Sequence, residues 1–208
     1  MKKIILTIYV AYCLVSCQDR GQDGPYLATG IRIGDVTQTE AVIWTRLSRN
    51  RTRINNGTQP YVFYRDDESG QLVNRSGRQD KVPVVLFEEG VTRELIEGAV
   101  PGAPGMVRVQ YKPKDEAQWT MTDWVSVDSS KNFTRKFYLD HLETGTHYDV
   151  LVEAKPPNEK MVSASMEGGF RTAPGDHNRE PVLFGVSTGQ GYGHQDTVDG
   201  FKIYNRML

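Results

Sequence analysis

Residues 139–154, LDHLETGTHYDVLVEA, decide the fold of this chain. Between residues 148 and 154 every second side chain is apolar, which is the pattern of a strand with one buried face. Gly145 supplies the preceding turn with a residue that tolerates a positive φ. Leu142 and Tyr148 fit a tyrosine corner, in which a tyrosine at the start of a strand hydrogen-bonds back to the turn before it. The stretch predicts the central strand of a β-sandwich, with a hairpin of another antiparallel fold as the alternative.

Further alternating segments predict the remaining strands of the sandwich. Residues 25–47 predict two strands with a turn at residues 35–39, and later strands are predicted in residues 106–111, 118–127, 132–139 and 168–174. Arg135 interrupts one apolar face and is placed at the rim, whereas Phe170 is placed inward. The pattern L-x-x-G-T-x-Y-x-V-x-V-x-A resembles the fibronectin type III group. We therefore expect a mainly β fold of about seven strands, a fibronectin type III- or immunoglobulin-like sandwich over residues 25–174.

Trp44 lies in the second predicted strand, where Val42 and Trp44 alternate. A large aromatic side chain often fills the space between two packed sheets, so Trp44 is predicted to be a core residue. The alternative is a surface tryptophan that binds carbohydrate.

Residues 48–105 interrupt the regular pattern and are predicted to be an insertion. Their two apolar patches, residues 61–64 and 82–87, predict a hairpin at the edge of the fold. Pro83 cannot donate a backbone hydrogen bond, so the second patch is expected to be an edge strand or a loop.

The N-terminus has the pattern of a bacterial lipoprotein signal. Lys2 and Lys3 precede an apolar run at residues 4–15 that is short for a membrane span, and Leu-Val-Ser-Cys at residues 14–17 resembles a lipobox. We expect residues 1–17 to be removed, Cys17 to be lipidated and residues 18–24 to form a tether. The protein would then be anchored to a membrane of the bacterial cell envelope, on its periplasmic or cell-surface side. The alternative is an ordinary signal peptide with a chance cysteine.

The balance of charged residues and the number of cysteines indicate which partners and which covalent links the protein is expected to have. The 208 residues include 25 Lys and Arg against 26 Asp and Glu, so no electrostatic nucleic-acid binding is expected. The two cysteines are Cys13, inside the predicted signal, and Cys17, so the mature protein is expected to have no disulfide.

The last 28 residues differ from the sandwich. Residues 175–180 predict a polar hinge, and the apolar run at residues 181–186 predicts a strand buried on both faces, as in an α/β domain. A glycine-rich turn follows, and Asp196 is placed as the N-cap of a helix. Residues 181–208 therefore predict the incomplete start of a second, α/β domain.

His194 and Asp196 are the only metal-ligand candidates in this segment. Hydrolytic zinc or iron centres need three or more ligands, so two candidates do not complete a site. A dinucleotide-binding motif is excluded because His194 stands where its last glycine is required. We assign no catalytic residue, and we expect no cofactor to be held by this chain alone.

Five segments resemble, in their order and spacing, the alkaline phosphatase D (PhoD-like) family: GIRIGDVTQTEAVIWTRL, VRVQY, NFTRKFYLDHLETGTHYDVLVEA, GGFRTAP and PVLFGVSTGQGYGHQDTVDGFKIYNRML. The resemblance implies a sandwich followed by a metallophosphoesterase domain, which hydrolyses phosphate esters with iron and calcium or another divalent metal. Two departures matter. Gly189 stands where the family commonly has a cysteine ligand, and the sequence stops at Leu208, before the Gly-Asp segment and the later ligands. The resemblance thus implies an N-terminal portion that acts on phosphate esters only when it is extended.

A cell-surface lipoprotein binding module is the alternative function. It would use the region of Trp119 and Trp124, or the insertion at residues 48–105. Sandwich folds serve many binding roles, so the fold alone does not decide between the two functions.

Overall fold

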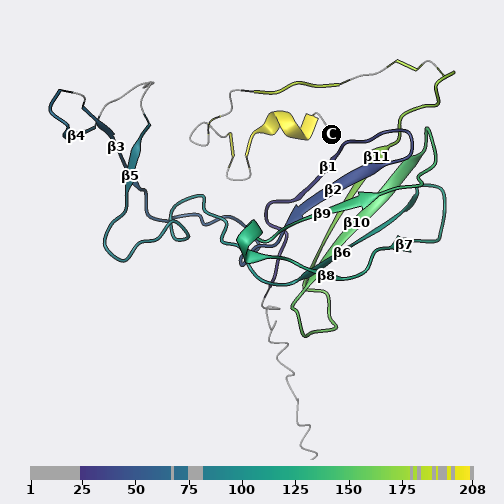
Figure 1. Ribbon diagram of the computed structural model, residues 1–208, viewed down its shortest axis with the longest axis horizontal. Coiled ribbons are helices and arrows are strands. Elements are labelled where there is room, and N and C mark those ends of the chain that lie inside the picture. The colour runs from purple at the N-terminus through teal and green to yellow at the C-terminus, as the bar shows by residue number, and fades with distance from the viewer. Residues whose placement is uncertain are drawn as a thin grey trace, which may run out of the picture.

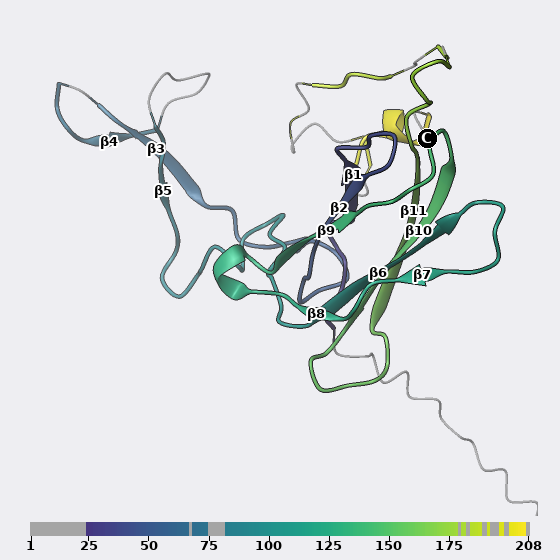
Figure 2. The same ribbon diagram turned by 45° about the vertical axis from the view of Figure 1, so that its right-hand side comes forward.

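In the computed structural model, two antiparallel sheets pack face to face (Figures 1 and 2). The described residues are 24–66, 68–74, 82–178, 180–181, 184–188, 191, 196–197 and 200–206. The smaller sheet has the order β1-β2-β9, with β1 at Ile31–Gly34, β2 at Ala41–Arg46 and β9 at Thr134–Leu139. The larger sheet has the order β11-β10-β6-β7, with β8 also paired to β6. The strands of this larger sheet are β6 at Met106–Pro113, β7 at Thr120–Met121, β8 at Val125–Ser126, β10 at His147–Lys155 and β11 at Ala164–Arg171.

The core lies between these sheets and is built from alternate residues of each strand. Its fully buried side chains include Ile43 from β2, Val109 from β6 and Val152 from β10. Burying each such side chain stabilises the fold by roughly 1.5–3 kcal/mol. The predicted sandwich is therefore confirmed, and its central strand is β10, which pairs with both β6 and β11.

The predicted tyrosine corner is also present. Tyr148 is 5% exposed, and its hydroxyl oxygen accepts a hydrogen bond from the backbone N–H of Glu143 at 2.8 Å. Its ring stacks on Phe170, with the ring centroids 5.3 Å apart. Gly145 has a φ of +69° in the turn between them, as the sequence predicts. These contacts fix the entry to β10.

The prediction that Trp44 is a core residue is wrong. In β2 the buried positions are Ala41, Ile43 and Thr45, so Trp44 points to the opposite, outer face of the sheet. The segment AVIWTR is apolar at neighbouring positions, so its pattern does not reveal which alternate set faces the other sheet. The buried hydroxyl of Thr45 has no hydrogen-bond partner among the described residues.

Two of the predicted strand boundaries differ from the structure. The strand predicted at residues 118–127 is split into β7 and β8, and residues 122–124 between them belong to neither strand, although the Thr122 N–H still donates to the Val109 carbonyl of β6. The last strand begins at Ala164, earlier than the predicted residue 168. Its first half, Ala-Ser-Met-Glu, is poor in β-branched and aromatic residues, and pairing with β10 holds it in the sheet.

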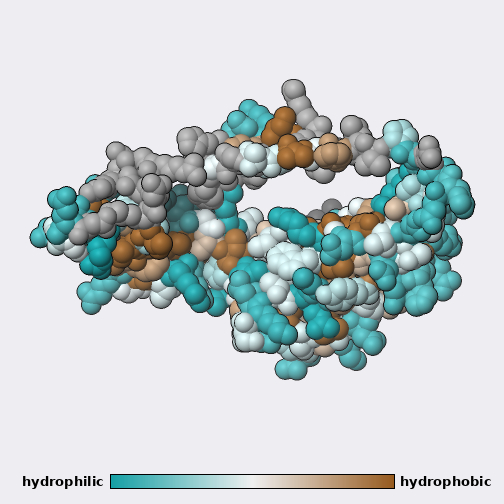
Figure 3. Space-filling model, turned by 45° about the horizontal axis from the view of Figure 1, so that its top comes forward, coloured by the Kyte–Doolittle hydropathy of each residue, from teal (hydrophilic) through white to brown (hydrophobic). Residues whose placement is uncertain are grey.

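The insertion forms a small sheet that projects from the sandwich (Figure 1). Its order is β4-β3-β5, with β3 at Tyr61–Arg65, β4 at Leu72–Val73 and β5 at Val84–Leu86. The predicted pairing of the two apolar patches is confirmed, and β5, which follows Pro83, is an edge strand. Figure 3 shows hydrophobic side chains on the surface of this projection.

The structure describes residues 181–208 only in part, so the start of a second domain there stays a prediction. No strand includes the described part of residues 181–186, and Phe184 and Val186 are 77% and 81% exposed. Such a strand needs pairing neighbours, and none of the described strands pairs with this segment. In place of the predicted helix, the described residues form a short 3-10 helix, η3 (Lys202–Arg206). Helices gain most of their stability from packing, and Ile203 is 51% exposed.

None of the helices that the structure describes is long and apolar enough to cross a membrane.

Candidate functional site

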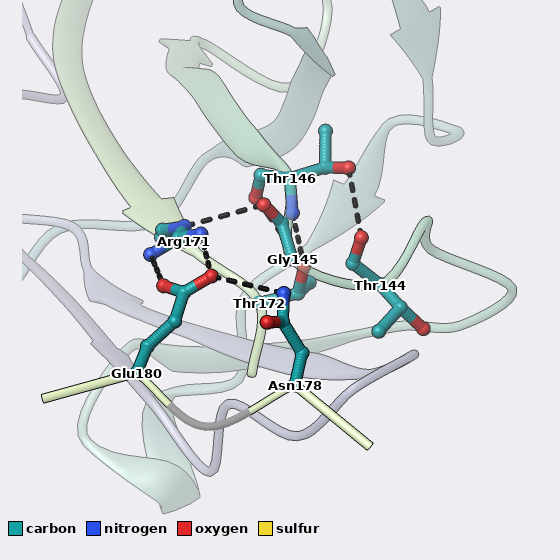
Figure 4. A network of polar contacts seen from close by, with 7 residues as sticks. All are labelled: Thr144, Gly145, Thr146, Arg171, Thr172, Asn178 and Glu180. Carbon is teal, nitrogen blue, oxygen red and sulfur yellow. Dashed lines mark hydrogen bonds and ion pairs between the residues drawn. The ribbon is translucent and has the colours of Figure 1, made fainter. Parts of the chain in front are cut away.

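A cluster of polar contacts holds the chain where it leaves the sandwich (Figure 4). Arg171, the last residue of β11, binds both carboxylate oxygens of Glu180, with 3.0 Å between Nη2 and Oε1. Its Nε donates to the carbonyl of Gly145 at 3.2 Å, and the Asn178 side-chain amide donates to Glu180 at 3.2 Å. A bidentate guanidinium–carboxylate pair fixes both distance and orientation. We call Arg171, Asn178 and Glu180 the exit clasp.

A second set of contacts ties the same segment to the sandwich. The buried hydroxyl of Thr172 donates to the Glu143 carbonyl at 2.6 Å and accepts from the Thr146 N–H at 2.9 Å. The Gln38 side-chain amide donates to a carboxylate oxygen of Asp176 at 2.6 Å. Residues 175–180, predicted as a hinge, are therefore held against the sandwich at several described positions.

In the exit clasp, Arg171 and Glu180 each stabilise the charged form of the other. The hydrogen bond from Arg171 lowers the pKa of Glu180 below its ordinary value, and the nearby positive charge adds to this effect. The hydrogen bond to Glu180 in turn raises the pKa of Arg171. Both groups are ionised at neutral pH, so the clasp is formed under physiological conditions.

Of the predicted site residues, the structure describes only Asp196. Its Oδ2 atom accepts a hydrogen bond from the Lys202 N–H at 3.0 Å, so it caps the start of η3. His194, the second predicted metal ligand, and Cys17, the predicted lipidation site, lie outside the described residues. Within the described part of the chain, no three His, Cys, Asp or Glu residues gather as metal ligands would.

Trp119 and Trp124 lie on the outer face of the larger sheet, each against basic side chains. The Lys112 ammonium is 5.3 Å from the centroid of the Trp119 ring, and the Arg108 and Lys155 charges are each 4.7 Å from the centroid of the Trp124 ring. These are cation–π contacts, which orient the indoles over the sheet.

Two of these cations, Arg108 and Lys112, also have carboxylate partners. Arg108 Nε lies 2.6 Å from Glu153 Oε2, and Lys112 Nζ lies 3.1 Å from Asp149 Oδ2. These two pairs offset the positive charges of Arg108 and Lys112 on this face. Each pair joins directly opposed residues of β6 and β10, so the pairing could be found from the sequence only if the register were known.

A cleft of about 730 Å³ lies where the insertion returns to the sandwich. Arg46 lines it, and its guanidinium donates to the carbonyls of Asn132 and Val100 and to the side-chain oxygen of Asn132. Burial lowers the pKa of Arg46. Because its guanidinium donates to the Val100 carbonyl as well as to Asn132, Arg46 holds the insertion in place.

Comparison with known proteins gives similarity of fold alone. No protein-family model matches the chain, and no curated protein matches it. Among solved structures, a redesigned β-sandwich protein is 16% identical, with 73% of this chain and 93% of that chain covered and a TM-score of 0.34. The structure of PhoD is 16% identical over 76% of this chain, with a TM-score of 0.40. The sensor domain of the anti-sigma factor RsgI4 from Pseudobacteroides cellulosolvens is 12% identical, with 69% of this chain and 91% of that chain covered and a TM-score of 0.35. The chain spans 21% of the PhoD structure.

Proposed function

We propose that this chain is the N-terminal portion of a membrane-anchored, PhoD-like phosphate ester hydrolase, and that residues 1–208 alone are inactive. The proposal rests on the order and spacing of the sequence segments that resemble that family, from residue 30 to the end. The sandwich is the fold that the resemblance implies for this region.

The observation that carries the structural side of the proposal is the exit clasp. Arg171 and Glu180 fix the path of the chain as it leaves the sandwich, directly before the apolar run at residues 181–186. Phe184 and Val186 then remain exposed, although apolar side chains of this size gain free energy from burial. In the proposal, the clasp orients this run as the first strand of a catalytic domain, whose other strands and helices bury it.

The residues that the structure describes do not fit the metal centre that the resemblance implies. Asp196 already accepts a backbone hydrogen bond, and Gly189 has no side chain to act as a ligand. Within the described ranges no group of three ligands is present. In the proposal, the ligands for iron and calcium come mainly from residues after Leu208, and residues 1–208 alone perform no hydrolytic step.

Attachment to the cell envelope is a further part of the proposal. A diacylglyceryl group on Cys17, followed by the tether at residues 18–24, would hold the sandwich beside the membrane. Replacing Cys17 by alanine should move the protein from the membrane fraction to the soluble fraction, whereas a Cys13→Ala variant should stay with the membranes.

The hydrolase proposal is tested by assaying two polypeptides with p-nitrophenyl phosphate and bis(p-nitrophenyl) phosphate. The first contains residues 1–208, and the second is the product of the complete reading frame, each supplied with iron and calcium. We expect hydrolysis from the second alone. A metal-loaded complete product with no activity toward either ester would contradict the proposal.

A further inference from the structure

The outer face of the smaller sheet carries a groove of about 390 Å³ along the edge strand β9. Its lining residues are Trp44, Lys131, Thr134, Arg135, Lys136 and Tyr138. The register places Trp44 opposite Lys136, and Tyr138 follows two positions later on the same face. Volumes of about 300–1,000 Å³ are typical of small-molecule sites. The groove is open to solvent on the side that faces away from the core.

The two aromatic rings of the groove are available for contact. Trp44 is half-buried and Tyr138 is 73% exposed. Among the described residues, no cation lies over either ring and no hydrogen bond reaches the Trp44 indole. Trp119 and Trp124 differ in this respect, since basic side chains already lie against both of them.

The groove also carries positive charge without a paired carboxylate. Its lining has three basic residues and no acidic residue. Within the described chain, none of Lys131, Arg135 and Lys136 forms an ion pair, and Arg135 alone lies near another ring, with its guanidinium 5.9 Å from the centroid of Phe137. Asp128 is the carboxylate that interacts with Lys131, but its Oδ1 accepts two hydrogen bonds from Ser130. Unpaired cations beside an open aromatic ring favour a ligand that has an apolar face and negative charge.

We propose that this groove binds an anionic carbohydrate. The C–H face of a sugar ring packs on the Trp44 indole, with Tyr138 beside it, as apolar groups pack on aromatic rings elsewhere. Carboxylate or phosphate substituents of the sugar pair with Lys131, Arg135 and Lys136. Single-stranded nucleic acid fits less well, because its binding sites span about 4–16 nucleotides, whereas this groove of about 390 Å³ offers two adjacent aromatic rings. The proposal is independent of the hydrolase activity.

The experiment follows the three indole N–H signals of the full chain in ¹⁵N–¹H NMR spectra, in a nonionic detergent. Single Trp→Phe variants assign the signals. The probes are trigalacturonate, the neutral trisaccharide maltotriose and inorganic phosphate. We expect trigalacturonate to shift the Trp44 signal selectively and to bind more tightly than either of the other probes.

Variants then separate the two parts of the groove. Trp44→Ala should weaken trigalacturonate binding about tenfold, with Trp119→Ala as the matched control that leaves it unchanged. Lys136→Gln should weaken binding about threefold at low salt and less at high salt, with the exposed Lys160→Gln as control. Thermal unfolding of each variant shows that it is folded, and the exposed Lys136 tests the groove even if Trp44→Ala is unstable.

Several results would overturn the proposal. If maltotriose bound as tightly as trigalacturonate, the basic residues would play no part in binding. If inorganic phosphate bound as tightly, the groove would be a general anion site and not a carbohydrate site. Absence of binding, or binding unaffected by both groove variants, would refute the site itself. Tighter binding of oligo(dT) or of phosphatidylglycerol vesicles through Trp44 would assign the groove to a different class of ligand.

Discussion

Replacing Tyr148 by phenylalanine tests the tyrosine corner that fixes the central strand. The substitution removes one oxygen atom and keeps the ring, so the stacking on Phe170 is retained. It deletes the hydrogen bond of 2.8 Å to the Glu143 N–H, made by a side chain that is only 5% exposed. A protein hydrogen bond contributes about 0.5–1.5 kcal/mol net, so we expect the free energy of unfolding to fall by about 1 kcal/mol.

Urea unfolding followed by circular dichroism measures this loss. The midpoint should fall while the slope of free energy against urea stays unchanged, because the same surface is exposed on unfolding. In thermal unfolding the expected fall in Tm is about 2–4 °C. The matched control is Tyr138→Phe, which removes the same atom from a side chain that is 73% exposed and should change stability by less than about 0.5 kcal/mol. If Tyr148→Phe costs no more than this control, the corner does not stabilise the sandwich.

Three other substitutions test the turn, the core and the exit clasp. Gly145→Ala places a side chain at a φ of +69° and should destabilise the fold by about 1 kcal/mol in urea titration; an unchanged midpoint would contradict the left-handed turn. Thr45→Val replaces a buried hydroxyl that has no described partner and should raise the free energy of unfolding by about 1 kcal/mol. A lower Tm in calorimetry would contradict this. Glu180→Gln removes the charge of the clasp. Because Arg171 depresses the pKa of Glu180, the wild-type advantage in stability should be complete above the ordinary value of 4.5 and disappear as the pH falls through the depressed pKa. If Tm measurements showed the wild-type advantage over Glu180→Gln growing below pH 4.5, the pKa of Glu180 would not be depressed by Arg171.

The central strand and its turn can be predicted from the sequence because the signals are local. Alternation over β10 marks its buried face, and Gly145 lies three residues before the tyrosine of the corner. The hairpin of the insertion is predicted for the same reason, since each of its two apolar patches is continuous in sequence. These features depend on neighbouring residues and need no knowledge of the tertiary fold.

The orientation of Trp44 could not be predicted in this way. In β2 both alternate sets of side chains contain apolar residues, so size suggests that the tryptophan is buried. The structure instead buries Ile43, and Thr45 takes an inward position despite its hydroxyl. Which set faces inward is decided by packing against the larger sheet, and this packing has no signature within six residues.

The candidate sites depend on contacts that join distant residues. Gln38 and Asp176 are 138 positions apart, and the cations beside Trp119 and Trp124 come from strands whose register must be known. Arg171 and Glu180 are only nine positions apart, but their pairing requires the intervening segment to fold back. Residue types alone therefore did not reveal the exit clasp. For the segment after Glu180, the predicted strand requires partners that none of the described strands supplies.

The nucleotide sequence directly after codon 208 tests the proposed function most directly. We predict that the reading frame continues into a strand followed by a Gly-Asp segment and, later, by clustered histidines that complete a metal centre. A stop codon directly after codon 208, or a continuation without these ligands, would contradict the assignment of this chain to the front of a PhoD-like hydrolase.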